Sequence, residues 1–294
     1  MLENLSTEKR NNNTMKMDEM SVLEILETMN QEDRLVPKAI ETELANIEKA
    51  VQKAIRSFKA GGRLIYIGAG TSGRLGILDA VECVPTFGVS SEQVVGIIAG
   101  GTEAIKTAIE GVEDNPELGM EDLKAISLKA DDTIVGIAAS GRTPYVIGAL
   151  QYAKQIGAET IAISCNKGAE VSGYADTAIE IETGAEVLTG STRLKAGTAQ
   201  KLVLNMISTA AMIGIGKVYG NLMVDVQATN AKLIERSKRI IMDAAQVDYE
   251  TAQRYYSEAD GHVKTAIVMS LLDCTKEQAV EKLEIAGGFV RKAL

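Results

Sequence analysis

Short apolar runs alternate with helical patterns through the middle of the chain. Five continuously apolar runs stand at 64–67, 94–98, 133–138, 160–163 and 177–181. Strands buried on both faces lack polar alternation, and such strands are typical of parallel sheets covered by helices. The pattern therefore predicts an α/β fold with a parallel sheet and helices on both faces. The helical stretches between the runs include 75–82, 104–110, 121–128 and 144–156.

Helical patterns also flank this central region. Between 21 and 58 the apolar spacing predicts two helices divided near Pro37, preceded by a polar arm at 1–17. From 194 to about 246 the chain is expected to be helical again. The tail repeats a similar unit at 261–267 and 288–294, which predicts three small helices of the ubiquitin-associated type. We expect N-terminal helices at 1–59 packed on a central domain at 60–247, and a C-terminal domain at 248–294.

The composition excludes several classes of protein. The 294 residues are 46% hydrophobic and 24% charged, as in an ordinary globular protein. The net charge of −9 and the 4% aromatic content disfavour binding to nucleic acid. A polar N-terminus and the lack of a long apolar run predict no signal peptide, no membrane segment and a cytoplasmic location. Three widely spaced cysteines and a single histidine predict neither a disulfide framework nor a metal centre.

The loop after the first predicted strand contains a glycine-rich motif. Gly68–Gly73 matches the G-x-G-x-x-G pattern of dinucleotide sites. A nicotinamide site also needs an acidic residue after the second strand, and that strand ends at Ile98–Gly101 without one. The hydroxyls of Thr71 and Ser72, beside free N–H groups at a helix start, suit a phosphate or a sugar. A dinucleotide site and a purely structural turn remain open alternatives.

Two further loops carry hydroxyl groups. The third strand is followed by Ser140–Pro144, in which Ser140 or Thr143 could bind a phosphate or simply cap the next helix. Because this loop lies at the same sheet edge as the first, the two could hold one phosphate from two sides. The cluster at 189–195 could add hydroxyls and a positive charge, or serve only to cap the long helix that follows.

Two glutamates are candidates for proton transfer. Glu82 stands in an apolar context near the expected end of a helix, and both features favour a protonated carboxyl. Glu113 follows the second strand and its helix, so it reaches the same sheet edge if its loop folds back. Each residue could instead be an ordinary exposed carboxylate. Asp79 is a weaker candidate, and His262 is expected to have a structural or surface role.

Several of these segments resemble the sugar isomerase (SIS) fold, and most closely the bacterial N-acetylmuramic acid 6-phosphate etherases. The glycine-rich loop and the Ser-Gly-x-Thr loop are common to many SIS proteins. The stretches at 82–87 and 110–114 are much more specific to the etherases and their close relatives. The resemblance covers nearly the whole chain, including 7–11, 68–76, 82–88, 98–101, 139–145, 191–198 and 263–269.

The resemblance implies a lyase that cleaves the ether between D-lactate and C3 of N-acetylmuramic acid 6-phosphate, in the cytoplasmic recycling of cell-wall sugars. It implies Glu82 as the acid and Glu113 as the base, with no metal or cofactor. Because the family is homodimeric with its site near the subunit interface, we expect a homodimer that binds a small phosphosugar. The residues expected to bind it are Thr71, Ser72, Ser140, Arg142, Thr143, Ser191, Thr192 and Lys195.

Two other functions remain open. A phosphosugar isomerase on the same scaffold would also use a glutamate base at C2, but it often needs a histidine for ring opening, and His262 is the only one. A non-catalytic phosphosugar-binding regulator, like the glucokinase regulatory proteins, would not need both glutamates. Both Glu82 and Glu113 are present, which favours the lyase.

Overall fold

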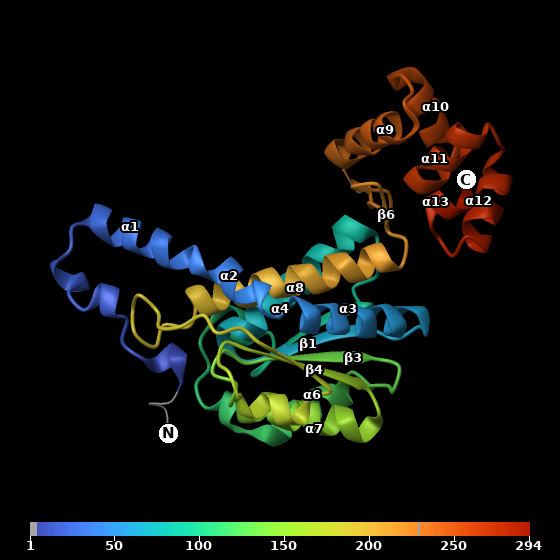
Figure 1. The fold of residues 1–294 in the computed structure, drawn as a ribbon. Helices are drawn as coiled ribbons and strands as arrows, with labels where there is room; N and C mark the ends of the chain where they lie inside the picture. Colours follow the sequence, from blue (N-terminus) through green and yellow to red (C-terminus); the bar gives the residue numbers. More distant parts are fainter. Residues whose placement is uncertain (1–4, 229) are drawn as a thin grey trace. The chain divides into compact units, whose positions relative to one another are not determined.

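A five-stranded sheet lies at the centre of the larger part of the chain (Figure 1). The computed structural model describes residues 5–228 and 230–294, so residues 1–4 of the predicted arm lie outside the described residues. All neighbouring strands are parallel, which confirms the predicted α/β fold with a parallel sheet. In chain order the strands are β1 (Leu64–Gly68), β2 (Val94–Ile98), β3 (Thr133–Ile137), β4 (Glu159–Ser164) and β5 (Thr177–Glu180).

The order of the strands across the sheet is β2-β1-β3-β4-β5. The chain passes from β1 to β2 on one side and then returns to add β3 on the other side of β1. The connections that leave β1 and β3 therefore diverge, and in open parallel sheets ligands bind outside the carboxyl ends of the strands at such a point. The topology therefore predicts a ligand site at the loops after β1 and β3.

Helices cover both faces of this sheet (Figure 1). On one face lie α3 (Leu44–Lys59), α4 (Gly70–Phe87) and α8 (Lys195–Gly214), and on the other lie α6 (Pro116–Ala125) and α7 (Pro144–Ile156). Ile65 and Ile67 of β1 join the buried cluster around α7. Tyr66, between them, points the opposite way and donates a hydrogen bond of 2.8 Å to Asp79 of α4. This covering of both faces explains why the strand is apolar throughout.

The N-terminal region differs from the two helices predicted. It contains α1 (Val22–Asp33) and α2 (Leu35–Glu41) before α3. Pro37 lies in the first turn of α2, where its missing N–H removes no intrahelical hydrogen bond. Proline therefore marks the beginning of an extra short helix here, instead of the division between two long ones.

The expectation of helix from 194 to 246 is wrong for its middle part. After α8 the chain forms a small antiparallel pair, β6 (Val218–Tyr219) and β7 (Leu222–Met223), before α9 (Ala231–Ala245). Gly216 and Gly220 have φ angles of +83° and +61°, in the left-handed region that L side chains rarely adopt. These glycines allow α8 to end and the hairpin to turn.

The chain divides into two compact units. One comprises the residues up to Val81 together with Glu92–Ser208, and the other comprises Glu82–Ser91 and Thr209–Leu294. The second has its own buried cluster, so a C-terminal helical region is present. The predicted boundaries at 59/60 and 247/248, and the ubiquitin-associated type of the tail, stay predictions. The small helices of the tail are α10 (Tyr249–Glu258), α11 (Val263–Leu272), α12 (Lys276–Ile285) and α13 (Val290–Ala293).

No helix in the described part of the chain is long and apolar enough to cross a membrane.

Candidate functional site

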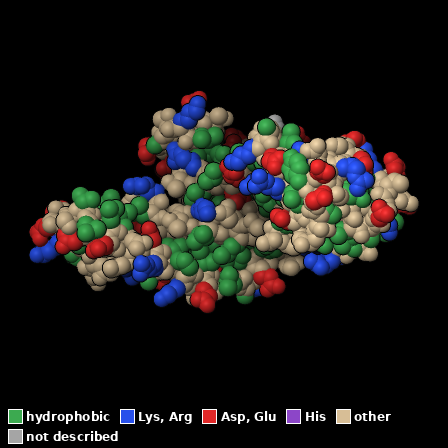
Figure 2. All heavy atoms as spheres, turned by 90° about the horizontal axis from the view of Figure 1, so that it is seen from above, with side chains coloured by type: hydrophobic (Ala, Val, Ile, Leu, Met, Phe, Trp, Pro, Cys, Tyr) green, Lys and Arg blue, Asp and Glu red, His purple; other side chains and the backbone are tan. Residues whose placement is uncertain are grey.

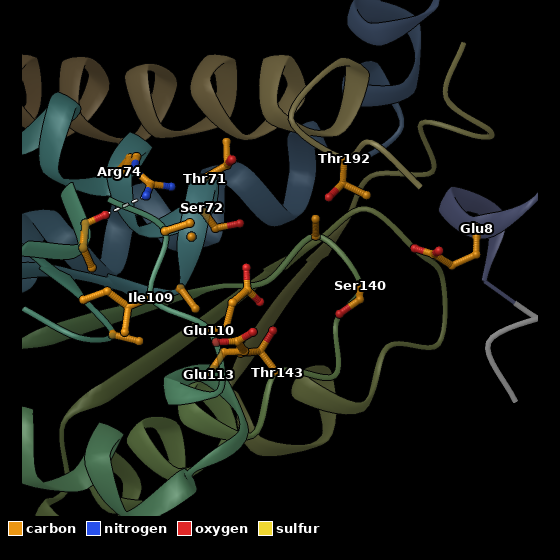
Figure 3. A pocket seen from close by; sticks show the side chains of 16 residues that line it. Glu8, Thr71, Ser72, Arg74, Ile109, Glu110, Glu113, Ser140, Thr143 and Thr192 are labelled. Atoms are coloured by element: carbon orange, nitrogen blue, oxygen red, sulfur yellow. Dashed lines mark hydrogen bonds between the residues drawn. The ribbon is translucent and has the colours of Figure 1, made fainter. Parts of the chain in front are cut away.

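A cavity of about 290 Å³ opens at the carboxyl ends of β1, β2 and β3. Its walls come from the loops that follow these three strands, with additions from the N-terminal arm and from the segment before α8 (Figure 3). This is the place where the strand order directs a ligand. Six residues predicted as site residues line the cavity together: Thr71, Ser72, Glu113, Ser140, Thr143 and Thr192.

The glycine-rich loop brings the start of α4 to the cavity. A Cβ added at Gly73 would lie 2.6 Å from the Gly68 carbonyl oxygen, so only glycine permits this close approach of helix and strand. The helix begins at Gly70, and the backbone N–H groups of its first turn have no partner within the helix. Thr71 and Ser72 lie in this turn and line the cavity. A helix N-terminus with two hydroxyls is a favourable site for a phosphate.

The second loop contributes Ser140 and Thr143. The backbone N–H of Arg142 donates a hydrogen bond of 3.3 Å to Ser140 Oγ, which orients this hydroxyl within its own loop. Thr143 is the residue before α7, and its side chain makes no capping hydrogen bond. The simple capping role that the sequence left open for Thr143 is therefore not used, and its hydroxyl lines the cavity.

Glu113 reaches the cavity from a short 3₁₀ helix, Val112–Asp114, in the connection after β2. This connection folds back to the sheet edge, as the sequence analysis required. Glu113 is half-buried, and Glu110 of the same segment also lines the cavity. Figure 3 shows both carboxyl groups entering from this segment.

Glu82 is not among the residues that line this cavity. It lies roughly 16 Å along the α4 axis from Thr71, by the rise of a helix, and its side chain is exposed. Two large apolar side chains near it on α4 are also exposed, Leu78 by 50% and Val81 by 60%. The apolar context expected for Glu82 therefore exists on its helix, but in the single chain this surface faces outward.

Three further predicted residues do not line the cavity: Arg142, Ser191 and Lys195. Arg142 and Ser191 are half-buried in loops that contribute neighbouring residues to it. Lys195 is buried, and its Nζ forms an ion pair of 2.6 Å with Glu32 of α1. The backbone N–H groups of Lys195 and Ala196 each donate a 2.9 Å hydrogen bond to the side chain of the buried Glu186. The Glu186 carboxyl group therefore caps the N-terminus of α8.

Three charged residues of the cavity were missed by the sequence analysis: Glu8, Arg74 and Glu110. The arm that carries Glu8 is held at Thr7, which is buried and exchanges hydrogen bonds with Asn166, at 3.3 Å through the Thr7 N–H and 3.0 Å through its hydroxyl. Thr7 and Asn166 are 159 positions apart in the sequence, so no local pattern indicates the contact. Figure 3 shows Glu8 facing the cavity from the side of the arm.

Arg74 is the only basic side chain among the described residues that line the cavity. Its guanidinium donates hydrogen bonds to three carbonyl groups of the segment after β2, at 2.7 Å to Ala104, 3.0 Å to Ile105 and 3.4 Å to Thr107. Arg74 thus connects the N-terminal part of α4 to the connection that carries Glu113. A short motif containing this arginine gives no hint of that role.

No cluster of three or more His, Cys, Asp or Glu side chains suited to a metal occurs among the described residues.

Comparisons with known proteins agree with this architecture. The family pattern described as "Glucokinase regulatory protein N-terminal SIS domain" matches residues 46–154, and the pattern described as "SIS domain" matches residues 103–210. A phosphoheptose isomerase from Francisella tularensis shares the fold, with a TM-score of 0.52 and 14% identity over 66% of this chain and 100% of that one. A phosphoheptose isomerase from Neisseria gonorrhoeae also shares it, with a TM-score of 0.51 and 16% identity over 65% of this chain and 98% of that one.

Sequence relatives are much more similar. An N-acetylmuramic acid 6-phosphate etherase from Geobacillus sp. (strain WCH70) is 69% identical over 100% of both chains. Etherases of the same name from Bacillus cytotoxicus and Bacillus cereus (strain G9842) are 68% and 66% identical, again over 100% of both chains. The chain therefore belongs to the N-acetylmuramic acid 6-phosphate etherase family, a family of carbon–oxygen lyases.

Proposed function

We propose that this protein converts N-acetylmuramic acid 6-phosphate to N-acetylglucosamine 6-phosphate and D-lactate. The observation that carries the proposal is the meeting of a helix N-terminus, several hydroxyls and the Glu113 carboxylate in one cavity at the edge of the sheet. The names of the 66–69% identical relatives support the choice of substrate. The 6-phosphate lies at the start of α4, where the hydroxyls of Thr71, Ser72, Ser140 and Thr143 surround it.

The reaction is an elimination followed by addition of water. In the open-chain sugar the C1 aldehyde acidifies the proton on C2, and the Glu113 carboxylate removes this proton. The electron pair forms the C2–C3 double bond while the C3–O bond breaks, and the Glu82 carboxyl gives its proton to the lactate oxygen. Water then adds across the double bond, with its hydroxyl on C3 and a proton returned to C2. Each positioned proton transfer typically contributes about 10²–10⁴-fold to the rate.

The proposed mechanism brings the two glutamates together across a homodimer. Glu82 is exposed beside Leu78 and Val81, away from the residues that line the cavity of its own chain. Exposed hydrophobic side chains also occur on other helices. Figure 2 shows hydrophobic side chains among charged ones on one face of the protein. In the proposed homodimer this surface of α4 is covered by the partner subunit. We therefore place Glu82 in the cavity of the partner subunit.

Release of D-lactate from N-acetylmuramic acid 6-phosphate tests the proposed reaction. The wild type should release it, and Glu82→Gln and Glu113→Gln should each lower kcat by at least roughly 10²-fold, since glutamine keeps the shape but cannot transfer the proton. Asp114→Asn is the matched control, because Asp114 is exposed, follows Glu113 and does not line the cavity. A wild type that binds the phosphosugar and releases no lactate would overturn the lyase.

Mixing the two inactive variants tests the shared site. When Glu82→Gln and Glu113→Gln subunits exchange at equal amounts, half of the dimers are hybrids, and each hybrid holds one site with both native glutamates. The mixture should recover about a quarter of the wild-type activity. No recovery, in a mixture shown by native mass spectrometry to contain hybrids, would mean that both glutamates act from the same chain.

A phosphosugar-binding regulator is the second candidate, because the glucokinase regulatory protein pattern matches residues 46–154. It predicts phosphosugar binding without lactate release, and a phosphosugar isomerase likewise predicts no lactate.

The proposed function also implies a cytoplasmic location. Three widely spaced cysteines, at 83, 165 and 274, are what a protein of a reducing compartment is expected to carry, and cell fractionation would test this.

A further inference from the structure

Ser72, in the first turn of α4, is held from behind by a glutamine of α8. Ser72 Oγ lies 3.0 Å from Gln200 Oε1 and donates a hydrogen bond to it. Ser72 is 7% exposed and lines the cavity, whereas Gln200 is 1% exposed and does not line it. Any effect of Gln200 on a ligand in the cavity therefore acts through Ser72.

The other end of the same amide is unpaired. Gln200 Nε2 is buried and has no hydrogen-bond partner among the described residues. A buried donor without an acceptor is costly, and the NH₂ group of a glutamine has two hydrogens to satisfy. Rotating the amide by 180° exchanges its oxygen and nitrogen without moving Ser72. In that orientation Nε2 donates to Ser72 Oγ, and the oxygen occupies the unpaired position.

The two orientations prepare Ser72 for different ligands. A phosphate dianion only accepts hydrogen bonds, so a serine that donates its single hydrogen to Gln200 has none left for the phosphate. With the amide rotated, Ser72 accepts from Gln200 and keeps its own hydrogen for the cavity. A phosphate there interacts better with the second orientation, and a ligand shifts an equilibrium by this difference in affinity.

We propose that Gln200 is a positioning residue for the phosphate site, with its amide nitrogen donating to Ser72 Oγ so that the Ser72 hydroxyl donates to the bound phosphate. The proposal rests on the proposed function in placing the 6-phosphate at the start of α4. It adds a contact behind the glycine-rich loop, from Gln200 to Ser72, and gives the Gln200 amide nitrogen a function in the phosphate site.

Two substitutions of similar length separate the orientations. Gln200→Met removes the donor and should raise KM roughly three- to tenfold, because Ser72 loses its orientation. Gln200→Glu places an ionised acceptor behind Ser72, which fixes the serine hydrogen away from the cavity, so KM should rise more than tenfold. The value of kcat should change less than KM in both variants, since the phosphate is bound equally in the ground state and the transition state.

A double-mutant cycle with Ser72→Ala decides the question. If Gln200 acts through Ser72, Gln200→Met should have no further effect on KM once Ser72 is alanine. Additive effects of the two substitutions, with native melting temperatures, would overturn the proposal, because a packing role or simple charge repulsion does not need the hydroxyl. If the buried charge of Gln200→Glu prevents folding, the methionine cycle alone still decides.

Binding of inorganic phosphate, measured by calorimetry, separates this proposal from the proposed function. The cycle should give the same coupling for the phosphate dissociation constant as for KM. A wild type that binds phosphate but releases no D-lactate would defeat the lyase and leave the role of Gln200 testable. A wild type that releases lactate, with an additive cycle in phosphate binding, would defeat the role of Gln200 alone.

Discussion

Lys195 and Glu32 form a buried ion pair that joins the start of α8 to α1, with 2.6 Å between Lys195 Nζ and Glu32 Oε2. The side chains are only 3% and 8% exposed. Burial raises the pKa of Glu32, but hydrogen bonds from Lys195 and Asn13 and the Lys195 charge outweigh it and lower the pKa. The ammonium group that the sequence suggested for the substrate is thus already paired, while Thr192, three residues earlier, lines the cavity.

Breaking this pair should destabilise the protein. Glu32→Gln removes the ion-pair partner of the buried Lys195 ammonium, and the free energy of unfolding should fall by about 3 kcal/mol in urea denaturation at pH 7. Glu19→Gln is the control, because the Lys16–Glu19 pair spans 3.7 Å with side chains 78% and 67% exposed. Its effect should stay below about 0.5 kcal/mol. Equal effects of the two substitutions would contradict this account.

The sheet and its loops could be predicted because their signals are local. Continuously apolar runs marked the strands, and the carboxyl ends of parallel strands meet at one edge whatever the rest of the chain does. The positions of Thr71, Ser140 and Thr143 follow from this rule alone. Glu113 required one more assumption, that its connection folds back, and the short 3₁₀ helix at Val112–Asp114 fulfils it.

The remaining part of the cavity depends on contacts between distant segments. Hydrogen bonds between Thr7 and Asn166 hold the arm that carries Glu8. The side chain of Lys195 binds Glu32, which lies 163 positions away in the sequence. No periodicity or motif encodes such pairs. Glu82 is exposed in its own chain. The shared site proposed above would account for this, because the pattern of one chain does not show which of its residues would serve a partner subunit.

A second prediction concerns acid stability and Asp132, which lies just before β3. Burial raises the pKa of Asp132. Hydrogen bonds from the Arg63 side chain and from the backbone N–H groups of Lys129 and Arg63, together with the Arg63 charge, outweigh burial, so the pKa lies below its usual 3.8. A carboxyl whose pKa is lower in the folded than in the unfolded state stabilises the folded state. The contribution is complete at pH values above the unfolded-state pKa, and it is lost as the pH falls through the folded-state pKa. The ion pair behind this shift has 2.7 Å between Arg63 Nη2 and Asp132 Oδ2.

Asp132→Asn should therefore lower the free energy of unfolding by about 3 kcal/mol at pH 7. The difference from wild type should narrow as the pH falls below about 4, where the Asp132 carboxylate of the unfolded chain begins to be protonated while that of the folded protein is still ionised. Urea denaturation between pH 7 and pH 2.5 measures this. Asp131→Asn, at the exposed neighbour, should give a small difference at every pH. A gap between Asp132→Asn and wild type that stays constant over this range would disprove the linkage.

Glu8 should contribute to substrate affinity. Its carboxylate faces the cavity from the arm and can accept a hydrogen bond from a hydroxyl or the amide N–H of the sugar (Figure 3). Glu8→Gln should raise KM about tenfold, because a hydrogen bond to a charged acceptor becomes a neutral one. Thr7→Val removes an anchor of the arm and should shift KM in the same direction. Unchanged KM in both variants would show that the arm does not reach the bound sugar.

Arg74 should act mainly on kcat. Its guanidinium holds the carbonyls of Ala104, Ile105 and Thr107, so it fixes the path of the segment that carries Glu113. Arg74→Lys cannot make these three contacts together, and a displacement of about 1 Å in a catalytic group can cost roughly 10²-fold in rate. We expect a fall in kcat of this order, with phosphate binding weakened less than about threefold. Lys106→Gln, an exposed change in the same segment, should leave both values near wild type. The opposite pattern, weak phosphate binding with kcat retained, would instead identify Arg74 as a direct ligand of the phosphate.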